Sequence, residues 1–200
     1  PWADTEKIPF TVAGPYLKTL FLQAFVIGLH DPSIRPSAND WETALVKTVD
    51  LIQPCHNSSC EQKWYVFDNS IKPKCPFCGT PFKGKLPVLN LYSSRKEGSF
   101  RPDNHRLMVY TNQSIFQWHV NNLLVPNEKL TEDQKKRVGY FVFHTDQWWL
   151  VNERLQDLMD VTKEPKVPVP IGEKLELKDG QKIRTYANPI ETDGLRSSCR

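Results

Sequence analysis

Four of the five cysteines in the chain lie between residues 55 and 78. They form two pairs, Cys55-x4-Cys60 and Cys75-x2-Cys78, with fourteen residues between the pairs. Cysteine thiolates at such spacings are typical ligands of a tetrahedral zinc ion. Four protein ligands leave no open position for a substrate, so the pattern predicts one structural zinc ion per chain, held by Cys55, Cys60, Cys75 and Cys78.

The residues around the cysteines leave two alternatives open. Gly79 directly follows the second pair and permits left-handed backbone geometry, as a tight metal-binding turn requires. The alternatives are a pair of disulfides or plain buried thiols, and a site in which His56 replaces Cys55 or Cys60. The absence of a secretion signal argues against disulfides. Cys199 lies far away in a polar tail and is not expected to be a ligand.

No sequence pattern for catalysis is evident. The chain has five histidines, His30, His56, His105, His119 and His144. None has a serine or cysteine partner in a recognisable local motif. Neither GxGxxG nor GxxxxGK[ST] occurs, so no loop that cradles phosphates is indicated. We therefore predict that this chain is not itself an enzyme.

The composition is typical of a soluble globular protein, with 39% hydrophobic and 24% charged residues. The net charge of +3 is too small to indicate nucleic-acid binding by electrostatics alone. No apolar run of roughly 18 residues and no charged-then-apolar leader is expected, so we predict a cytoplasmic location without membrane contact. The opening PWADTEK reads as the middle of a longer protein, and we expect the chain to be a fragment.

Residues 1–53 are predicted to form two helices. Pro15 suits the first turn of the first helix and Gly28 its far end. Ser37, with Asp40 three residues on, offers a variant of the capping box that begins the second helix. The apolar faces consist of Leu17, Leu20, Phe21, Ala24 and Phe25 in the first helix, and of Trp41, Leu45, Val49 and Ile52 in the second. We expect Leu20, Phe21 and Phe25 to pack on the ribbon or on the sandwich, and otherwise to make the chain self-associate or aggregate.

Residues 54–85 are predicted to form a zinc ribbon, and residues 86–186 a β-sandwich. The candidate strands are Val88–Tyr92, Leu107–Tyr110, Ile115–Val120, Tyr140–His144, Trp148–Val151, Lys174–Leu177 and Lys182–Thr185. Asp179-Gly180 predicts a hairpin between the last two strands. Residues 121–137 are predicted to be a polar loop with one helical turn from Thr131. The tail, residues 187–200, is predicted to be disordered or left by cloning. The expected fold class is therefore α+β.

The segment Gly28–Ser37 reads GLHDPSIRPS and is followed by Trp41-Glu42 and Ala44-Leu45. It resembles the last two helices of a protein-kinase C-lobe. In that family the arginine that corresponds to Arg35 pairs with the acid of the APE motif. The surrounding run LFLQAFVIGLHDPSIRPSANDWETAL is most similar to bacterial kinases encoded with tellurite-resistance and stress operons. In those kinases a cysteine-rich ribbon and a β-rich domain follow the C-lobe.

The kinase match covers about residues 15–53. The Gly-rich loop, the strand lysine, the HRD loop and the DFG motif are absent from the chain, so the resemblance implies a non-catalytic region. It also implies partners, because triads of this kind join the kinase to a phosphatase and a von Willebrand A-domain protein. We expect docking on that A-domain, with an acid of this chain completing a shared Mg²⁺ site. The candidate acids are Glu97, Asp103, Glu128 and Asp146.

The β segment resembles a forkhead-associated sandwich in strand spacing and in the runs WWLVNERLQDL and GEKLELKDGQKI. Phosphothreonine readers of that family use a Ser-x-x-His element and an Asn-Gly pair. Here Ser114 and His119 have a different spacing, and Asn152 is followed by Glu153, so the reading surface is not carried over.

These features together predict a regulatory, protein-interaction region of a bacterial Ser/Thr-type protein kinase, which docks on an A-domain partner in a tellurite- and stress-resistance phosphorylation system. The alternative is a phosphopeptide- or nucleic-acid-recognition module built on the ribbon and the sandwich.

Overall fold

The structure is a computed structural model that describes residues 9–84, 86–96, 99–121, 123–185 and 192–199. The chain divides into two compact units, Pro1–Gly84 and Lys85–Arg200. The predicted helical segment and the predicted ribbon, which the sequence separates at residue 53, thus belong to one unit.

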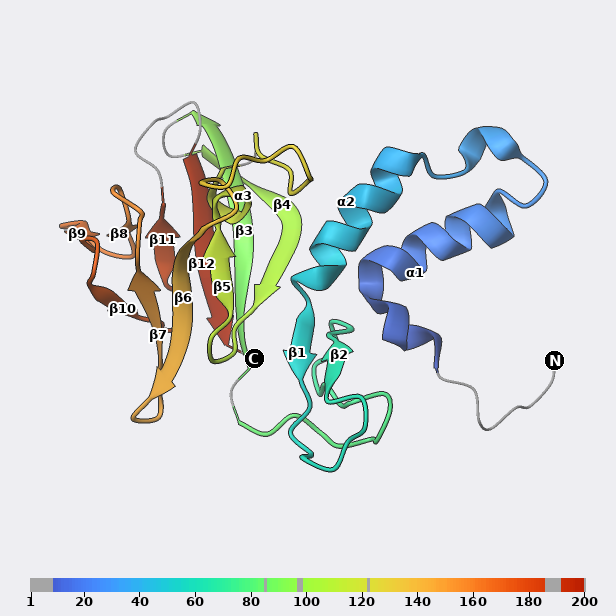
Figure 1. The fold of residues 1–200 in the computed structure, drawn as a ribbon, viewed down its shortest axis with the longest axis horizontal. Coiled ribbons are helices and arrows are strands. Elements are labelled where there is room, and N and C mark those ends of the chain that lie inside the picture. Colours follow the sequence, from blue (N-terminus) through green and yellow to red (C-terminus); the bar gives the residue numbers. More distant parts are fainter. Residues whose placement is uncertain (1–8, 85, 97–98, 122, 186–191, 200) are drawn as a thin grey trace. The chain divides into compact units, whose positions relative to one another are not determined.

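The first unit contains two helices and one small sheet (Figure 1). Its helical elements are η1 (Phe10–Ala13), α1 (Gly14–Leu22), the π-helical turn η2 (Gln23–Ile27), η3 (Pro32–Ile34) and α2 (Ala38–Val49). Its strands are β1 (Ile52–Pro54) and β2 (Trp64–Val66), which pair antiparallel.

The sequence signals for the two helices are confirmed. Pro15 lies in the first turn of α1. Ser37 and Asp40 form the capping box that begins α2, with the Ser37 N–H donating to the Asp40 carboxylate over 2.8 Å. Between the helices Arg35 donates from Nε to the Gly28 carbonyl over 2.7 Å and from Nη2 to the Leu29 carbonyl over 2.9 Å. Arg35, whose counterpart in the kinase family pairs with an acid, thus bonds to backbone carbonyls near the end of the first helical segment.

The predicted apolar faces are not buried as expected. Phe21 stands edge-on to Trp41 at 5.1 Å and so joins α1 to α2, yet it remains partly exposed. Phe25 is 63% exposed and Val49 is 61% exposed. The buried residues of α2 are instead Ala44 and Thr48, because small side chains let two helices approach closely. The prediction that Phe21 and Phe25 pack on the ribbon or on the sandwich is therefore wrong for Phe25, which is exposed, and for Phe21, which packs on Trp41 of the helical segment instead.

The segment Phe10–Ile27 is long enough, at 18 residues, and apolar enough to cross a membrane, and only 6% of it is buried. The expectation that no such run exists is wrong, because Gly14, Pro15 and Thr19 interrupt the run without making it polar, and Lys18 is its one charged residue. A single helix of this kind near the N-terminus does not establish a membrane span, since signal sequences and core helices share its length and composition.

The second unit is built mainly from two antiparallel sheets. One sheet has the order β10-β7-β6-β5 and the other has the order β4-β3-β12-β11-β8-β9 (Figure 1). The strands are β3 (Pro87–Lys96), β4 (Ser99–Met108), β5 (Ser114–Phe116), β6 (Arg137–His144), β7 (Gln147–Asn152), β8 (Met159–Asp160), β9 (Val167–Pro168), β10 (Lys174–Glu176), β11 (Lys182–Arg184) and β12 (Thr192–Cys199). A short helix, α3 (Gln117–Val120), follows β5.

Both sheets contribute to one hydrophobic core. Leu89 of β3 and Leu107 of β4 come from the larger sheet, and Ile115, Phe141 and Leu150 come from the smaller one. All five side chains are fully buried. This shared core explains why alternating apolar residues in widely separated strands face the same interior.

Three predictions for this unit are wrong. Gln117–Val120 is helical rather than part of a strand. Asp179-Gly180 forms a turn, with Gly180 at φ +72°, but β10 and β11 do not pair with each other, because the two strands belong to different sheets. Thr192–Cys199, expected to be disordered, forms β12 between β3 and β11. Its backbone hydrogen bonds to these two strands hold it in the sheet, although its polar sequence gives no sign of a strand.

Asn152, the last residue of β7, is completely buried, and its side chain bonds to the segments around Leu155 and Val169. Its Nδ2 donates to the carbonyls of Leu155 and Val169 over 2.7 and 2.8 Å, and its Oδ1 accepts from the Leu155 N–H over 2.8 Å. Every hydrogen bond of the amide is thus made within the protein.

We expect Asn152→Ala to lower the free energy of unfolding by about 3 kcal/mol, because it leaves buried backbone groups of Leu155 and Val169 unpaired. Urea denaturation measures the loss. Gln147→Ala, at an exposed position of the same strand, is the matched control and should change stability little. Equal effects of the two substitutions would contradict this role for Asn152.

Candidate metal centre

Local backbone geometry positions each of the four cysteines. Cys55 directly follows β1, and its N–H donates to the Lys63 carbonyl over 2.7 Å. Cys60 lies in a turn closed by its own N–H on the Asn57 carbonyl over 3.0 Å.

The second pair of cysteines occupies a tight turn. The Cys75 N–H donates to the Thr80 carbonyl over 2.8 Å, and the Gly79 N–H donates to the Cys75 carbonyl over 2.9 Å. Gly79 has φ +73°, a left-handed conformation that a residue with a side chain rarely adopts. The structure thus confirms the prediction that this glycine permits the turn after Cys78.

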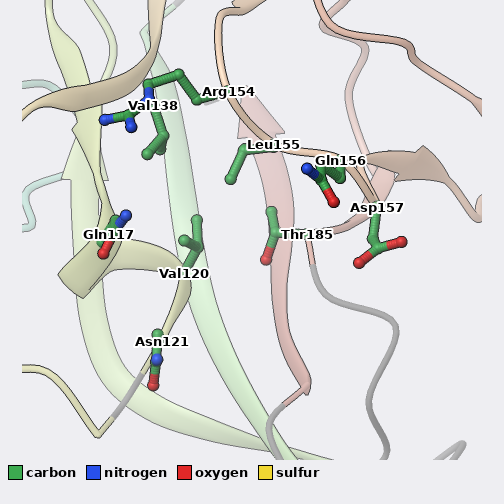
Figure 2. Close-up of a pocket in the computed structure, with 9 residues that line it drawn as sticks. All are labelled: Gln117, Val120, Asn121, Val138, Arg154, Leu155, Gln156, Asp157 and Thr185. Carbon is green, nitrogen blue, oxygen red and sulfur yellow. The ribbon is translucent and has the colours of Figure 1, made fainter. Parts of the chain in front are cut away.

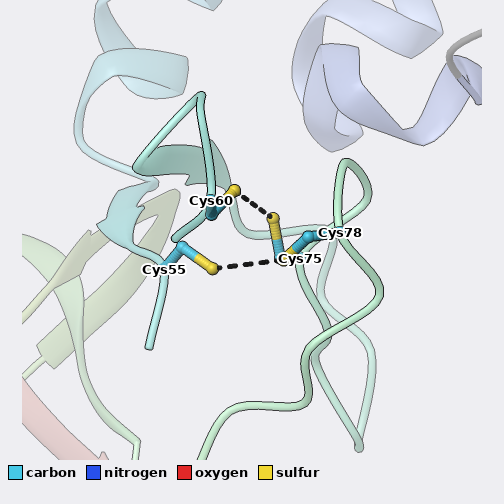
Figure 3. A group of neighbouring side chains, drawn as sticks. All are labelled: Cys55, Cys60, Cys75 and Cys78. Atoms are coloured by element: carbon cyan, nitrogen blue, oxygen red, sulfur yellow. Dashed lines mark hydrogen bonds between the residues drawn. The ribbon is translucent and has the colours of Figure 1, made fainter. Parts of the chain in front are cut away.

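The four sulfur atoms converge on one point (Figure 3). Cys55 Sγ and Cys78 Sγ are 3.5 Å apart, Cys60 Sγ and Cys75 Sγ are 3.8 Å apart, and all four lie within 4.8 Å of one another. A tetrahedral ion with metal–sulfur bonds of about 2.3 Å places its ligands about 3.8 Å apart. The donor set therefore has the dimensions of a four-thiolate metal site.

The alternatives to this ligand set do not match the geometry. A disulfide requires sulfur atoms about 2.05 Å apart, and all four thiols are free. His56 lies outside the cluster, where its ring contacts Phe82 at a centroid distance of 4.2 Å. Its Nδ1 accepts a hydrogen bond from the Lys83 N–H over 3.1 Å. Burial, followed by the charge of Lys83, lowers the pKa of His56.

Hydrogen bonds from neighbouring groups favour the thiolate form at one end of the site. The Thr80 hydroxyl lies 3.2 Å from Cys78 Sγ, and this hydroxyl and the Thr80 N–H lower the pKa of Cys78 to about 6. Burial raises the pKa of Cys55 to about 12 and also raises the pKa of Cys75. Ligation of a cation as thiolates would therefore require proton release more from Cys55 and Cys75 than from Cys78.

Supporting residues around the site carry no motif of their own. Tyr65 packs with the buried sulfurs of Cys60 and Cys75, and burial raises the pKa of its phenol. The Asn57 N–H donates to Cys55 Sγ over 3.4 Å. Such contacts orient the ligands, as outer-shell groups do in metal sites. The sequence indicates such supporting residues only by their position near a ligand, since Asn57 and Thr80 each lie two residues after a cysteine.

The acids predicted to reach a partner are scattered. Asp103 accepts a hydrogen bond from the Ser93 hydroxyl over 2.6 Å and is only half-exposed. Glu128 lies exposed in a loop, and Asp146 lies exposed at the tip of the β6–β7 hairpin with φ +60°. Glu97 lies outside the described residues. The structure thus leaves Glu128 and Asp146 best placed for contact with another protein.

The second unit contains a separate cavity of about 230 Å³ (Figure 2). Its floor is apolar, with Val120, Val138 and Leu155, and its rim carries amide and charged side chains. The Arg154 guanidinium at this rim pairs with Asp133 over 2.7 Å. Ordinary ligand pockets measure about 300–1,000 Å³, so this cavity is small for a cofactor.

Comparisons with known protein families, curated proteins and solved structures found no match for the chain.

We expect Cys75→Ser to reduce the bound metal from about one ion per chain to a trace, because a four-thiolate site loses a buried ligand. Elemental analysis of the purified protein measures the content. Cys199→Ser is the matched control, since Cys199 is not assigned to the site, and this variant should retain its metal. Retention of metal by the Cys75 variant would refute the ligand assignment.

Proposed function

We propose that this chain is a non-catalytic, protein-interaction region of a bacterial protein kinase, held together by one structural zinc ion. The convergence of Cys55, Cys60, Cys75 and Cys78 within 4.8 Å is the observation that carries the proposal. Four protein ligands complete a tetrahedral shell and leave no position for a substrate, which favours a structural role over a catalytic one.

Zinc is the metal that suits this donor set best. Soft thiolates favour zinc or iron–sulfur centres over magnesium or calcium. Four sulfur atoms within 4.8 Å of one another, two pairs of them 3.5 and 3.8 Å apart, are compatible with a single ion in a mononuclear site. Proton release from Cys55 and Cys75 offsets part of the binding energy, and the rest stabilises the fold around the ion.

The exposed face of the helical hairpin supports an origin in a larger protein. Phe25, Val26 and Ile27 at the end of the first helical segment are 63–66% exposed, and exposed apolar residues gathered in this way mark an interaction surface. In the resemblance to a kinase C-lobe these two helices end the lobe, so the remainder of the lobe is the natural cover for this face. Arg35 bonds to the carbonyls of Gly28 and Leu29 and so keeps the loop between the helices ordered, whether or not the rest of a kinase lobe is present.

The partner that we propose is the von Willebrand A-domain protein of the same tellurite- and stress-resistance system, with a phosphatase as the third member. Glu128 and Asp146 are exposed carboxylates on loops, as the completion of a shared Mg²⁺ site requires. The second unit is in this proposal a forkhead-associated-like sandwich. Two antiparallel sheets with a common core support this description. A cytoplasmic location follows from the same system.

We expect the chain to bind the purified A-domain protein when zinc and magnesium are both present, in a titration followed by calorimetry. One of the two substitutions, Glu128→Gln or Asp146→Asn, should weaken binding at least tenfold, because the acid that completes the shared Mg²⁺ site loses its charge. Glu132→Gln, at an exposed acid that pairs with Lys135, is the matched control. Absence of any binding heat would sink the proposed partner.

We also expect the chain on its own to self-associate through the hairpin, because its apolar face has no cover among the described residues. Sedimentation equilibrium over a hundredfold range of concentration measures this. Phe25→Glu should shift the protein to the monomer. Phe143→Glu, which changes an exposed phenylalanine of the second unit, should not. A wild-type chain that stays monomeric throughout would contradict the expectation.

A further inference from the structure

The β1–β2 ladder determines which backbone groups of β2 are already used. The Phe67 N–H donates to the Leu51 carbonyl over 2.8 Å, and the Cys55 N–H donates to the Lys63 carbonyl over 2.7 Å. Gln53 and Tyr65 are paired midway between these two contacts. Hydrogen-bonded and non-hydrogen-bonded pairs alternate in an antiparallel ladder, so the backbone groups of Val66 point away from β1.

The outer edge of β2 has no strand beside it among the described residues, where the sheet contains β1 and β2 alone. No described backbone group bonds to the N–H or the C=O of Val66. The same alternation places the backbone N–H of Asp68 on this edge. Unpaired backbone donors and acceptors along a strand edge are a template for a further strand.

A cavity of about 310 Å³ lies at this edge. Val66 and Asp68 line it from the strand, Thr11 lines it from η1, and Lys74 and Pro76 line it from the turn that holds Cys75. The Val66 side chain packs against Gly14 at the start of α1, whereas the Tyr65 side chain packs against the cysteines. The lining thus comes from both faces of the small sheet, as expected for a slot that runs along the edge.

We propose that this slot binds an extended peptide segment of a partner protein, which adds to β2 as a third strand. Strand addition uses the peptide backbone for affinity and alternate side chains for selectivity. Asp68 and Lys74 flank the slot and form no ion pair with any described residue, so a peptide with a basic residue near Asp68 and an acidic residue near Lys74 complements it.

This inference rests on the proposed function in one respect, namely that the chain recognises other proteins. It does not require the A-domain as the partner. The metal shapes one wall of the slot through Cys75, so the metal-loaded form is the binding form.

The test is selection of phage-displayed random dodecapeptides on the zinc-loaded full chain. We expect enriched peptides that slow hydrogen exchange at the Val66 amide. N-methylation of the peptide at every second residue should weaken binding at least tenfold, while N-methylation at the intervening residues should leave the affinity unchanged, because only alternate peptide N–H groups face β2. Removal of the metal by a chelator should abolish binding.

Asp68→Lys serves as a protein variant that leaves the metal ligands intact. It should reduce binding of the selected peptides and shift a new selection toward acidic residues. Failure to enrich any peptide overturns the proposal, and so does binding that ignores the pattern of N-methylation. The calorimetric titration with the A-domain protein is a separate measurement, so failure of the proposed partner and failure of the proposed peptide site can be distinguished.

Discussion

Convergence of four sulfur atoms is the interaction on which the first unit depends. β1 and β2 have three residues each. The buried cluster around the cysteines contains Cys60, Tyr65 and Cys75, with Cys55 at its margin, and Leu51 and Phe67 are buried at the end of the ladder. A core of this size offsets only part of the conformational entropy that is lost when the segment becomes ordered. A structural zinc ion supplies about 10–16 kcal/mol of apparent binding energy in small zinc domains, which is the scale that such a segment needs.

The position of the cysteines also affects the start of α1, through the strand β2. Gly14 has φ +69° and lies so close to the Val66 side chain that an added Cβ would overlap it. The start of α1 is therefore docked on β2, and the position of β2 in turn follows from the cysteines at the ends of the ladder. A change at the four cysteines should therefore alter the packing at the start of α1. The apolar residues near Phe25 lie at the other end of the helical segment and should be affected less.

The local elements could be read from the sequence where local chemistry determines them. The capping box of Ser37 and Asp40, the cysteine spacings and the left-handed Gly79 each depend on a few adjacent residues, and the structure confirms them. Sheet membership could not be read in this way. The Asp179-Gly180 turn is local, but the partners of β10 and β11 are chosen by the core, which lies far away in sequence. β12 was missed because its pairing is entirely with backbone of distant strands and its sequence is polar.

A metal ion that contributes to the stability of the cysteine-rich segment would have a consequence for its surface. An ion held by the four cysteines would supply part of the folding energy, so fewer large apolar side chains are needed inside the cysteine-rich segment, where Tyr65 and Phe67 are buried. Trp64, Ile71 and Phe77 are accordingly exposed, Ile71 to 83%. In a domain of the same size without metal, these side chains would have to form the core. A metal at the four cysteines would therefore do more than hold the segment together, since it would leave the edge of β2 at Val66 and several apolar side chains available to another protein.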